Sequence, residues 1–283
     1  MHSVLPMEKI PQMSSPPSFR TRRGPQRIVC LTEEPTEILY RLGEQDRIVG
    51  ISAYTVRPPE AKRDKPVVSA FVGGSIPKIV ALKPDLVIGF SDIQADLARD
   101  LIAANLQVLI FNQRSIQEIL DVIVDLGNLV HCEAAAAKMV SEYMARIDAA
   151  YERGQSREIK PRVYFEEWDD PMICGIEWVS ELIEIAGGKD IFADVSRGKL
   201  AKERFVDEAR VRELDPELML ASWCGKALDA PSVYARKTMG DVTALREKRL
   251  VEVPAEIILQ PGPACLTDGL DCLEEIIAGV ADR

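Results

Sequence analysis

The sequence predicts an α/β fold in which two lobes, each with a parallel-type sheet, are joined by one long rigid helix. Three observations predict this class: one unit occurs twice, strands alternate with helices in both halves, and an uninterrupted helical segment lies between the halves. The repeated unit reads "TEILYRLGEQDRIVG" (36–50) and "SELIEIAGGKDIFAD" (180–194). Each copy has a hydroxyl residue, a Glu, two aliphatic residues, and then a Gly and an Asp at matching positions.

The first lobe is expected to span residues 27–130, after a Pro- and Ser-rich segment, 1–26, that is typical of a disordered tail. It opens with a strand at 27–31. A helix is expected to start at Thr36, whose hydroxyl can cap free N–H groups, and to end at Gly43. A helix end, a Pro turn and a buried strand follow in "IVALKPDLVIGF" (79–90), and "QVLIFN" (107–112) is the next strand.

The linking segment, residues 131–158, predicts a single helix. Val140, Tyr143, Met144, Ile147 and Tyr151 recur at helical spacing, and no Pro or Gly interrupts the pattern before residue 154. A continuous helix of about 20 residues spans about 30 Å, so we expect it to hold the lobes stiffly, without large hinge opening.

The second lobe, residues 159–283, repeats the order of the first. A strand at 162–166 is followed by a loop at 167–179, and a helix is expected from Ser180 to Gly187. "VRELDPELMLAS" (211–222) matches the helix end, Pro turn and buried strand of the first lobe, and "RLVEVPA" (249–255) supplies the last strand. The loop at 167–179 is much longer than its counterpart at 32–35.

Composition excludes several classes of function. A formal net charge of −10 disfavours a nucleic-acid partner, and no stretch reaches the roughly 18 apolar residues of a membrane span. The six cysteines show no CxxC spacing, and the two histidines, His2 and His131, are too few for a typical transition-metal site. No His lies near a candidate Ser or Cys nucleophile, so we expect neither catalytic nor metal-binding residues. The start of the chain lacks a secretory signal, which predicts a cytoplasmic protein.

The candidate binding residues lie in loops that follow the strands, where ligands bind in open α/β sheets. Trp168 and Trp178 fall in the loop at 167–179, and Trp223 follows the strand at 217–222. The first lobe offers Tyr54, Phe71 and Phe90 at matching points. The alternative is that these rings fill cores beneath the loops, the commonest fate of a buried aromatic side chain.

Acidic residues in the same loops restrict the classes of ligand that the cleft could bind. Glu33 and Glu34 face their counterparts Asp169 and Asp170 across the predicted cleft, and together they would repel an anionic ligand. Stabilisation of helix N-termini is the alternative role of these charges. Cys224, in "SWCGK", is the one thiol expected at the cleft, with a structural role favoured over a reactive one. The residues therefore favour a neutral or cationic ligand.

The chain resembles the class III periplasmic binding proteins, and specifically the cobalamin-binding branch that serves ABC importers, from residue 27 to the C-terminus. The motifs that carry the resemblance are "TEILYRLGEQDRIVGIS", "IVALKPDLVIGF", "EEWDDPMICGIEWVSELIEIAGG", "PELMLASWCG" and "QPGPACLTDGLDCLEEI". The resemblance implies a corrinoid, cobalamin or cobinamide, held between the lobes without catalysis. It also implies ligand contacts at these positions: Trp168, Trp178, Trp223, Cys224, Gly225, the region after Tyr54, and the loop that holds Gln260 and Gly262.

The chain departs from this family in three places. It lacks the secretion signal, the first helix opens with Glu33, Glu34 and Pro35 instead of small polar residues, and the two permease-docking glutamates are replaced by Pro77 and Ala209. We therefore expect a cytoplasmic corrinoid-binding protein that is uncoupled from an importer, or a periplasmic one if the true start lies upstream.

Other ligands and an enzymatic role stay open as alternatives. Haem would need a His or Tyr axial ligand, and an acidic ferric siderophore would need cleft arginines, for which Arg57, Arg197 and Arg236 are the candidates. A corrinoid- or tetrapyrrole-processing enzyme is the alternative from another class, with Glu34, Asp169 and Cys224 as its first candidate residues.

Overall fold

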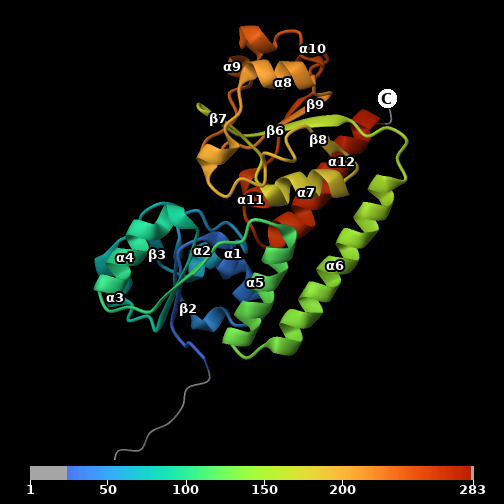
Figure 1. The fold of residues 1–283 in the computed structure, drawn as a ribbon. Coiled ribbons are helices and arrows are strands. Elements are labelled where there is room, and N and C mark those ends of the chain that lie inside the picture. Colours follow the sequence, from blue (N-terminus) through green and yellow to red (C-terminus); the bar gives the residue numbers. More distant parts are fainter. Residues whose placement is uncertain (1–23, 282–283) are drawn as a thin grey trace, which may run out of the picture.

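The computed structural model describes residues 24–281, and it contains two α/β lobes connected by one long helix (Figure 1). Most of the predicted tail, 1–26, lies outside the described residues, as does His2. At the edge of that segment, the backbone N–H groups of Gln26 and Arg27 donate hydrogen bonds to the Asp85 carboxylate at 2.9 Å and 2.8 Å. These bonds fasten the start of the first strand to the turn before a neighbouring strand.

The first lobe is built on a five-stranded sheet in the order β3-β2-β1-β4-β5, and every neighbouring pair is parallel. Its strands are β1 (Ile28–Cys30), β2 (Ile48–Ser52), β3 (Val67–Ser69), β4 (Leu86–Phe90) and β5 (Val108–Phe111). Its helices are α1 (Glu33–Arg41), η1 (Gln45–Arg47), α2 (Ala61–Asp64), α3 (Ile76–Ala81), η2 (Asp92–Gln94), α4 (Ala95–Ala103) and α5 (Ile116–Leu129).

The second lobe has a sheet in the order β10-β9-β6-β7, with β8 also paired to β6. Its strands are β6 (Arg162–Asp169), β7 (Met172–Cys174), β8 (Lys189–Asp190), β9 (Leu218–Ala221) and β10 (Leu250–Glu252). Its helices are α7 (Glu177–Ile185), η3 (Ala201–Arg204), α8 (Glu208–Leu214), α9 (Ala230–Tyr234), η4 (Lys237–Met239), α10 (Thr243–Arg246), α11 (Ala255–Ile258), η5 (Cys265–Gly269) and α12 (Leu270–Ala281). The predicted α/β class with parallel-type sheets is confirmed, except that β7 runs antiparallel to β6.

The segment between the lobes is one helix, α6 (Glu133–Gln155), of 23 residues. It lies beside α5 and extends toward the second lobe (Figure 1). Arg153 forms a bidentate ion pair with Glu274 of α12 at 2.9 Å and 2.8 Å, and Arg146 pairs with Asp271. The prediction of one uninterrupted helix in this segment is confirmed, and its C-terminal half is tied to the last helix of the chain.

The repeated unit forms the same structure twice, although both helices begin earlier than predicted. α1 starts at Glu33 rather than Thr36, and α7 starts at Glu177 rather than Ser180. The predicted caps were wrong because the first N–H groups find other partners: the N–H of Trp178, for example, donates to the carbonyl of Arg114 at 2.9 Å. Both helices therefore keep their equivalence while starting without a Ser or Thr side-chain cap.

The two glycine stops are confirmed in detail. Gly43 has φ +78° and Gly187 has φ +92°, the left-handed conformation that glycine adopts without steric cost. In each copy the N–H of this glycine and the N–H of the next residue bond back into the last helical turn, at 3.1 Å and 2.8 Å after α1 and at 3.2 Å and 2.9 Å after α7. Both helices end in a Schellman motif, which satisfies their last carbonyl groups.

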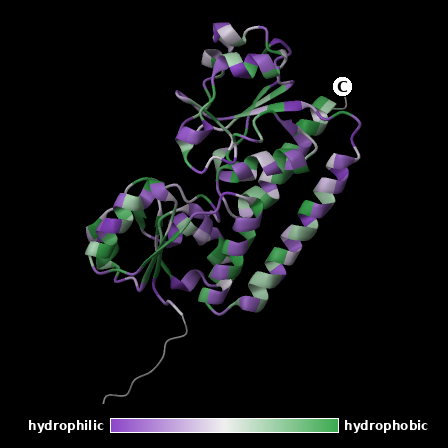
Figure 2. Cartoon of the chain, viewed as in Figure 1, coloured by the Kyte–Doolittle hydropathy of each residue, from purple (hydrophilic) through white to green (hydrophobic). Residues whose placement is uncertain are grey.

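A shared hydrophobic core joins the lobes. One cluster of buried side chains includes Ile38 and Leu86 of the first lobe, Val163 and Leu182 of the second, and Leu270 of α12. Figure 2 shows hydrophobic residues along the strands of both sheets and a mixture of hydrophobic and hydrophilic residues on the surrounding helices. Because the core is continuous across the junction, the two lobes form a packed unit rather than two bodies on a flexible tether.

Candidate ligand-binding site

A cavity of about 730 Å³ lies where the carboxyl ends of the strands from both lobes meet, and we call it the inter-lobe pocket. Loops after β2, β3, β9 and β10 supply most of its walls, as the topology of open α/β sheets predicts. Its volume is within the range of about 300 to 1,000 Å³ typical of small-molecule sites. Among the predicted site residues, those that line the pocket are Glu33, Tyr54, Phe71, Trp223, Cys224, Gly225 and Gln260.

The first lobe contributes an aromatic pair to the pocket. The rings of Tyr54 and Phe71 meet edge to face with centroids 6.5 Å apart, and 46% of Tyr54 is exposed. Across the pocket, a Cβ atom placed on Gly225 would lie 3.9 Å from the Tyr54 hydroxyl. The loops of the two lobes therefore approach each other at Tyr54 and Gly225.

The second lobe fixes Trp223 through a buried ionic network. The indole Nε1 donates to Glu166 Oε1 at 3.2 Å, and Arg236 holds both carboxylate oxygens of Glu166 at 2.6 Å and 2.9 Å. The hydroxyl of Tyr164 donates to Glu166 Oε2 at 3.1 Å, and Glu166 is completely buried. Since Glu166 uses both oxygens on three partners, it determines the orientation of the indole at the pocket wall.

Lys226 lies between two indole rings at the edge of the pocket. Its ammonium nitrogen is 4.3 Å from the centroid of the Trp168 ring and 4.6 Å from that of Trp223. It also donates to Asp169 Oδ1 at 2.6 Å. Burial acts to raise the pKa of Asp169, but this hydrogen bond and charge outweigh it and lower that pKa. Trp168 and Asp169 thus do not line the pocket; they contact Lys226, which does.

The acidic pair at the start of α1 is buried. Desolvation raises the pKa of Glu33 to about 7 and the pKa of Glu34 to about 8. The Oε2 atom of Glu33 is buried and has no hydrogen-bond partner, whereas Glu34 accepts a hydrogen bond from the Thr32 hydroxyl at 2.8 Å. Gly262 packs against Glu34, because a Cβ atom at Gly262 would come within 2.7 Å of the Glu34 Cβ. Glu34 and Gly262 therefore pack against each other, and neither lines the pocket.

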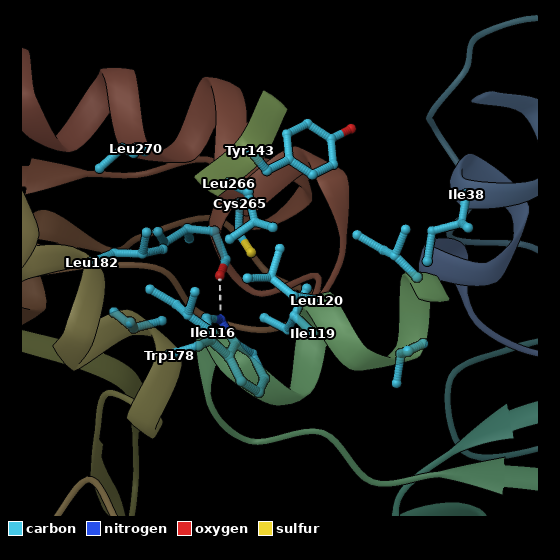
Figure 3. Close-up of a cluster of buried hydrophobic side chains, with 14 of the residues drawn as sticks. Ile38, Ile116, Ile119, Leu120, Tyr143, Trp178, Leu182, Cys265, Leu266 and Leu270 are labelled. Carbon is cyan, nitrogen blue, oxygen red and sulfur yellow. Dashed lines mark hydrogen bonds between the residues drawn. The ribbon is translucent and has the colours of Figure 1, made fainter. Parts of the chain in front are cut away.

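Two predicted ligand contacts, Trp178 and Phe90, are core residues. Trp178 is 2% exposed and its indole donates to the carbonyl of Ile258 at 2.9 Å, within the cluster drawn in Figure 3. Because α7 begins at Glu177, Trp178 lies in the first helical turn and not in a loop. Phe90 is buried at the end of β4 beneath the Arg114 guanidinium, 5.1 Å from the ring centroid. Neither residue lines the inter-lobe pocket, so the structure gives no support to a ligand contact at either.

The other candidate groups are engaged or neutral. Arg57 pairs with Glu37 and Asp268, and Arg236 is held by Glu166, so neither offers an open cationic site. Desolvation raises the pKa of the Cys224 thiol to about 11, which keeps it in the neutral form near pH 7. Within residues 24–281, no group of three or more His, Cys, Asp or Glu side chains is arranged to hold a metal ion, and no helix has both the length and the apolar character to cross a bilayer.

Several lining residues were missed in the sequence. They are Val56, Val72, Ser222, Lys226, Ala227, Glu252, Val253, Pro254, Ala255, Glu256 and Leu259. Most follow β9 or β10 directly, so the same rule that singled out Trp223 identifies them once it is applied to the segment after residue 252. A neighbouring hollow of about 500 Å³ shares Val56 and Glu256 with the pocket and extends it along α1.

Comparisons with known proteins agree with this architecture. The profile of the family described as periplasmic binding protein matches residues 28–257. An uncharacterised ABC transporter substrate-binding lipoprotein of Bacillus subtilis is 26% identical, over 90% of this chain and 81% of that protein. The vitamin B12-binding protein of Vibrio campbellii is 29% identical, over 89% of each chain.

Solved structures show the same fold. The periplasmic vitamin B12-binding protein of Vibrio cholerae aligns with a TM-score of 0.71 at 23% identity, covering 92% of this chain and 99% of that one. The periplasmic haem-binding protein of Roseiflexus aligns with a TM-score of 0.73 at 22% identity, covering 90% and 100%. At this identity the structural likeness supports the fold alone. Since the Bacillus subtilis relative is described as a lipoprotein, the predicted cytoplasmic location gains no support.

Proposed function

Because the chain belongs to the periplasmic binding protein family, whose members bind ligands and do not catalyse reactions, we propose that it binds a corrinoid such as cobalamin or cobinamide in the inter-lobe pocket. The observation that carries this proposal is that aromatic residues from both lobes line the pocket, Tyr54 and Phe71 from the first lobe and Trp223 from the second. The proposal takes 27–130 and 159–283 as the lobes that flank the ligand and 131–158 as the segment that links them.

The chemistry of a corrinoid complements this pocket. The corrin ring offers a large apolar surface against which aromatic side chains pack, and its rim carries amide groups that donate hydrogen bonds. Glu33 has a buried carboxyl oxygen without a partner, and such a group gains most when a ligand donor satisfies it. The neighbouring hollow beside Val56 and Glu256 gives additional space for a ligand larger than the pocket itself.

A titration with cyanocobalamin tests the proposal. The expected result is a corrin spectrum that stays with the protein after desalting, together with quenching of tryptophan emission. Tyr54→Ala and Phe71→Ala should each weaken binding by about 1 to 3 kcal/mol, as is usual for aromatic anchors at a binding site. Tyr234→Ala is the matched control, because Tyr234 is also exposed but lies on α9, outside the residues that line the pocket. Wild-type affinity in both pocket variants would contradict the site assignment.

Haem is a second candidate, favoured by one observation. Tyr54 lines the pocket and is 46% exposed, and a tyrosine can serve as the axial ligand of haem iron. A titration with haemin distinguishes the two ligands: if haem is the ligand, wild-type protein should give a shifted haem spectrum that Tyr54→Phe loses. Retention of cyanocobalamin by Tyr54→Phe, without any haem spectrum in the wild type, would favour the corrinoid.

Association with an ABC transporter is typical of this family. Pro77 and Ala209, which occupy the two positions of the family's docking glutamates, are exposed on α3 and α8. We propose on this ground that docking to an importer is weaker here than in relatives that carry both glutamates. Introducing glutamate at both positions should strengthen capture by a cobalamin importer of the family, and unchanged capture would contradict this explanation.

A further inference from the structure

We propose that Lys226 is the specificity-determining residue of the pocket: its side chain occupies the slot between Trp168 and Trp223, and a flat or cationic ligand group must displace it to bind. This inference rests on the proposed function in one respect, since a corrinoid is taken as the displacing ligand. Lys226 thereby acts as an internal competitor of the ligand.

The slot has the chemistry of a cation site. The Lys226 ammonium lies within about 6 Å of both ring centroids, at 4.3 Å and 4.6 Å, so the electron-rich faces of two indoles attract one charge. Asp169 closes a third side through the 2.6 Å ion pair. A ligand group that replaces the ammonium gains the same two aromatic faces, and a cationic group also gains the Asp169 carboxylate.

Hydrogen bonds fix the walls of the slot, whereas the Lys226 side chain that occupies it is partly exposed and flexible. Trp223 is 3% exposed and bonded to the buried Glu166, and the indole of Trp168 donates to the carbonyl of Asp170 at 3.0 Å. The Lys226 side chain is 41% exposed and rests on a long, rotatable stem, so it reaches water without moving the backbone. Its displacement therefore leaves an aromatic slot already formed.

The backbone turn explains why this lysine folds back onto the rings. Gly225 has φ +80°, and the Lys226 N–H donates to the carbonyl of Trp223 at 3.4 Å, so residues 223–226 make a tight turn that needs glycine. The turn places the Lys226 side chain beside Trp223, its neighbour across the turn. The competitor and one wall of the slot are thus built from a single "WCGK" segment.

Two measurements on Lys226→Ala test the proposal. Without ligand, removal of the ammonium should uncover the indoles, so acrylamide should quench tryptophan emission more strongly than in the wild type. With cyanocobalamin, the variant should bind about threefold to tenfold more tightly, because displacement of an exposed cation–π contact and ion pair no longer opposes binding. Lys226→Arg keeps a cation over the rings and should resemble the wild type in both measurements. Lys237→Ala removes an exposed lysine of the same lobe and serves as the control.

The outcomes separate the failure of this inference from failure of the proposed function. Weaker binding of cyanocobalamin by Lys226→Ala would show that the lysine holds the ligand, and unchanged acrylamide quenching would show that it does not cover the rings; either result overturns the inference. If neither wild type nor variant binds cyanocobalamin, the corrinoid proposal fails. The quenching comparison alone then decides whether Lys226 occupies the slot.

Discussion

The two copies of the repeated unit place different chemistry at the same point of the same structure. Counted from the hydroxyl residue of each copy, Glu34 of α1 corresponds to Trp178 of α7, and both side chains are 2% exposed. In the first copy the buried group is a carboxyl held by Thr32, and in the second it is an indole held by the carbonyl of Ile258. Repetition therefore conserves the backbone and its glycine stop, while the buried side chain is free to differ.

The strand ends of the two copies differ further. β1 is followed almost at once by α1, whereas β6 is longer, carries Trp168 and Asp169 at its end, and then turns into β7. Two ion pairs underlie this hairpin: Glu166 with Arg236, and Glu167 with Arg204, whose side chain is 4% exposed. The second lobe thus builds its part of the pocket on buried charge pairs, which the first lobe does without at the equivalent place.

Breaking one of these pairs should have the largest effect on stability. Arg236→Ala leaves the Glu166 carboxylate buried and unpaired, which should lower the free energy of unfolding by about 3 to 5 kcal/mol. Arg212→Ala removes an exposed pair with Asp241 and should cost less than about 1 kcal/mol. Urea denaturation of the two variants measures the difference. Equal losses would mean that burial of the charge pair does not distinguish the second lobe.

Substitution of the glycine that ends each helix should have the next largest effect on stability, and the effect should differ between the two copies. Alanine at Gly43 meets no atom within 4 Å, so Gly43→Ala should cost only the left-handed conformation, about 1 to 2 kcal/mol. Alanine at Gly187 meets the Cα and carbonyl of Gly154 at 2.9 Å as well, so Gly187→Ala should cost at least about 1 kcal/mol more. Thermal and urea unfolding check the order. The reverse order would contradict close packing of α6 against the second copy.

The buried carboxyl of Glu34, in the first copy, should make the stability of the protein depend on pH. The pKa of Glu34 is raised from its ordinary 4.5 to about 8 by desolvation, so between these values the folded protein binds a proton that the unfolded chain releases. The stability of the wild type should therefore fall as the pH rises through this window. Glu34→Gln removes this loss, and the variant should gain on the order of 1 to 3 kcal/mol relative to the wild type between pH 5 and pH 9.

Urea unfolding at pH 5, 7 and 9 measures this effect. Glu33→Gln provides the comparison, since the pKa of Glu33 is raised only to about 7 and its effect should be complete at lower pH. Parallel pH profiles for the wild type and Glu34→Gln would show that the buried carboxyl does not take up a proton on folding.

The sequence predicted features that depend on neighbours along the chain and missed those that depend on distant partners. Gly43 and Gly187 were found because a left-handed helix stop is a local requirement, and α6 was found because its apolar spacing is regular. The start of α7 was missed because the partner of its first N–H groups, the carbonyl of Arg114, comes from the other lobe. That error placed Trp178 in a loop, and together with the family resemblance it made this residue an expected ligand contact.

The residues of the pocket also divide into those that local sequence predicts and those that depend on distant partners. The rule that ligands lie beyond the strand ends located Tyr54, Phe71 and Trp223, since it needs only the order of strands. The rule could not show that Trp168 lies near the pocket while Trp178 lies in the core. The two residues are separated by the antiparallel strand β7, and a strand of three residues is too short to give a recognisable sequence pattern. Lys226 was overlooked since nothing in the sequence shows that a lysine will fold back between two indoles.

Hydrogen bonds between the two lobes restrict how a ligand reaches the inter-lobe pocket. The N–H of Trp178 at the start of α7 donates to Arg114 of the first lobe, and the N–H of Ile116 at the start of α5 donates to Glu181 of α7 at 2.6 Å. The N-terminus of each helix thus donates a hydrogen bond to the other lobe. Separation of the lobes would break both bonds at once and would cost about 1 to 3 kcal/mol for each buried donor left without an acceptor. We therefore expect a ligand to enter the inter-lobe pocket without separation of the two lobes.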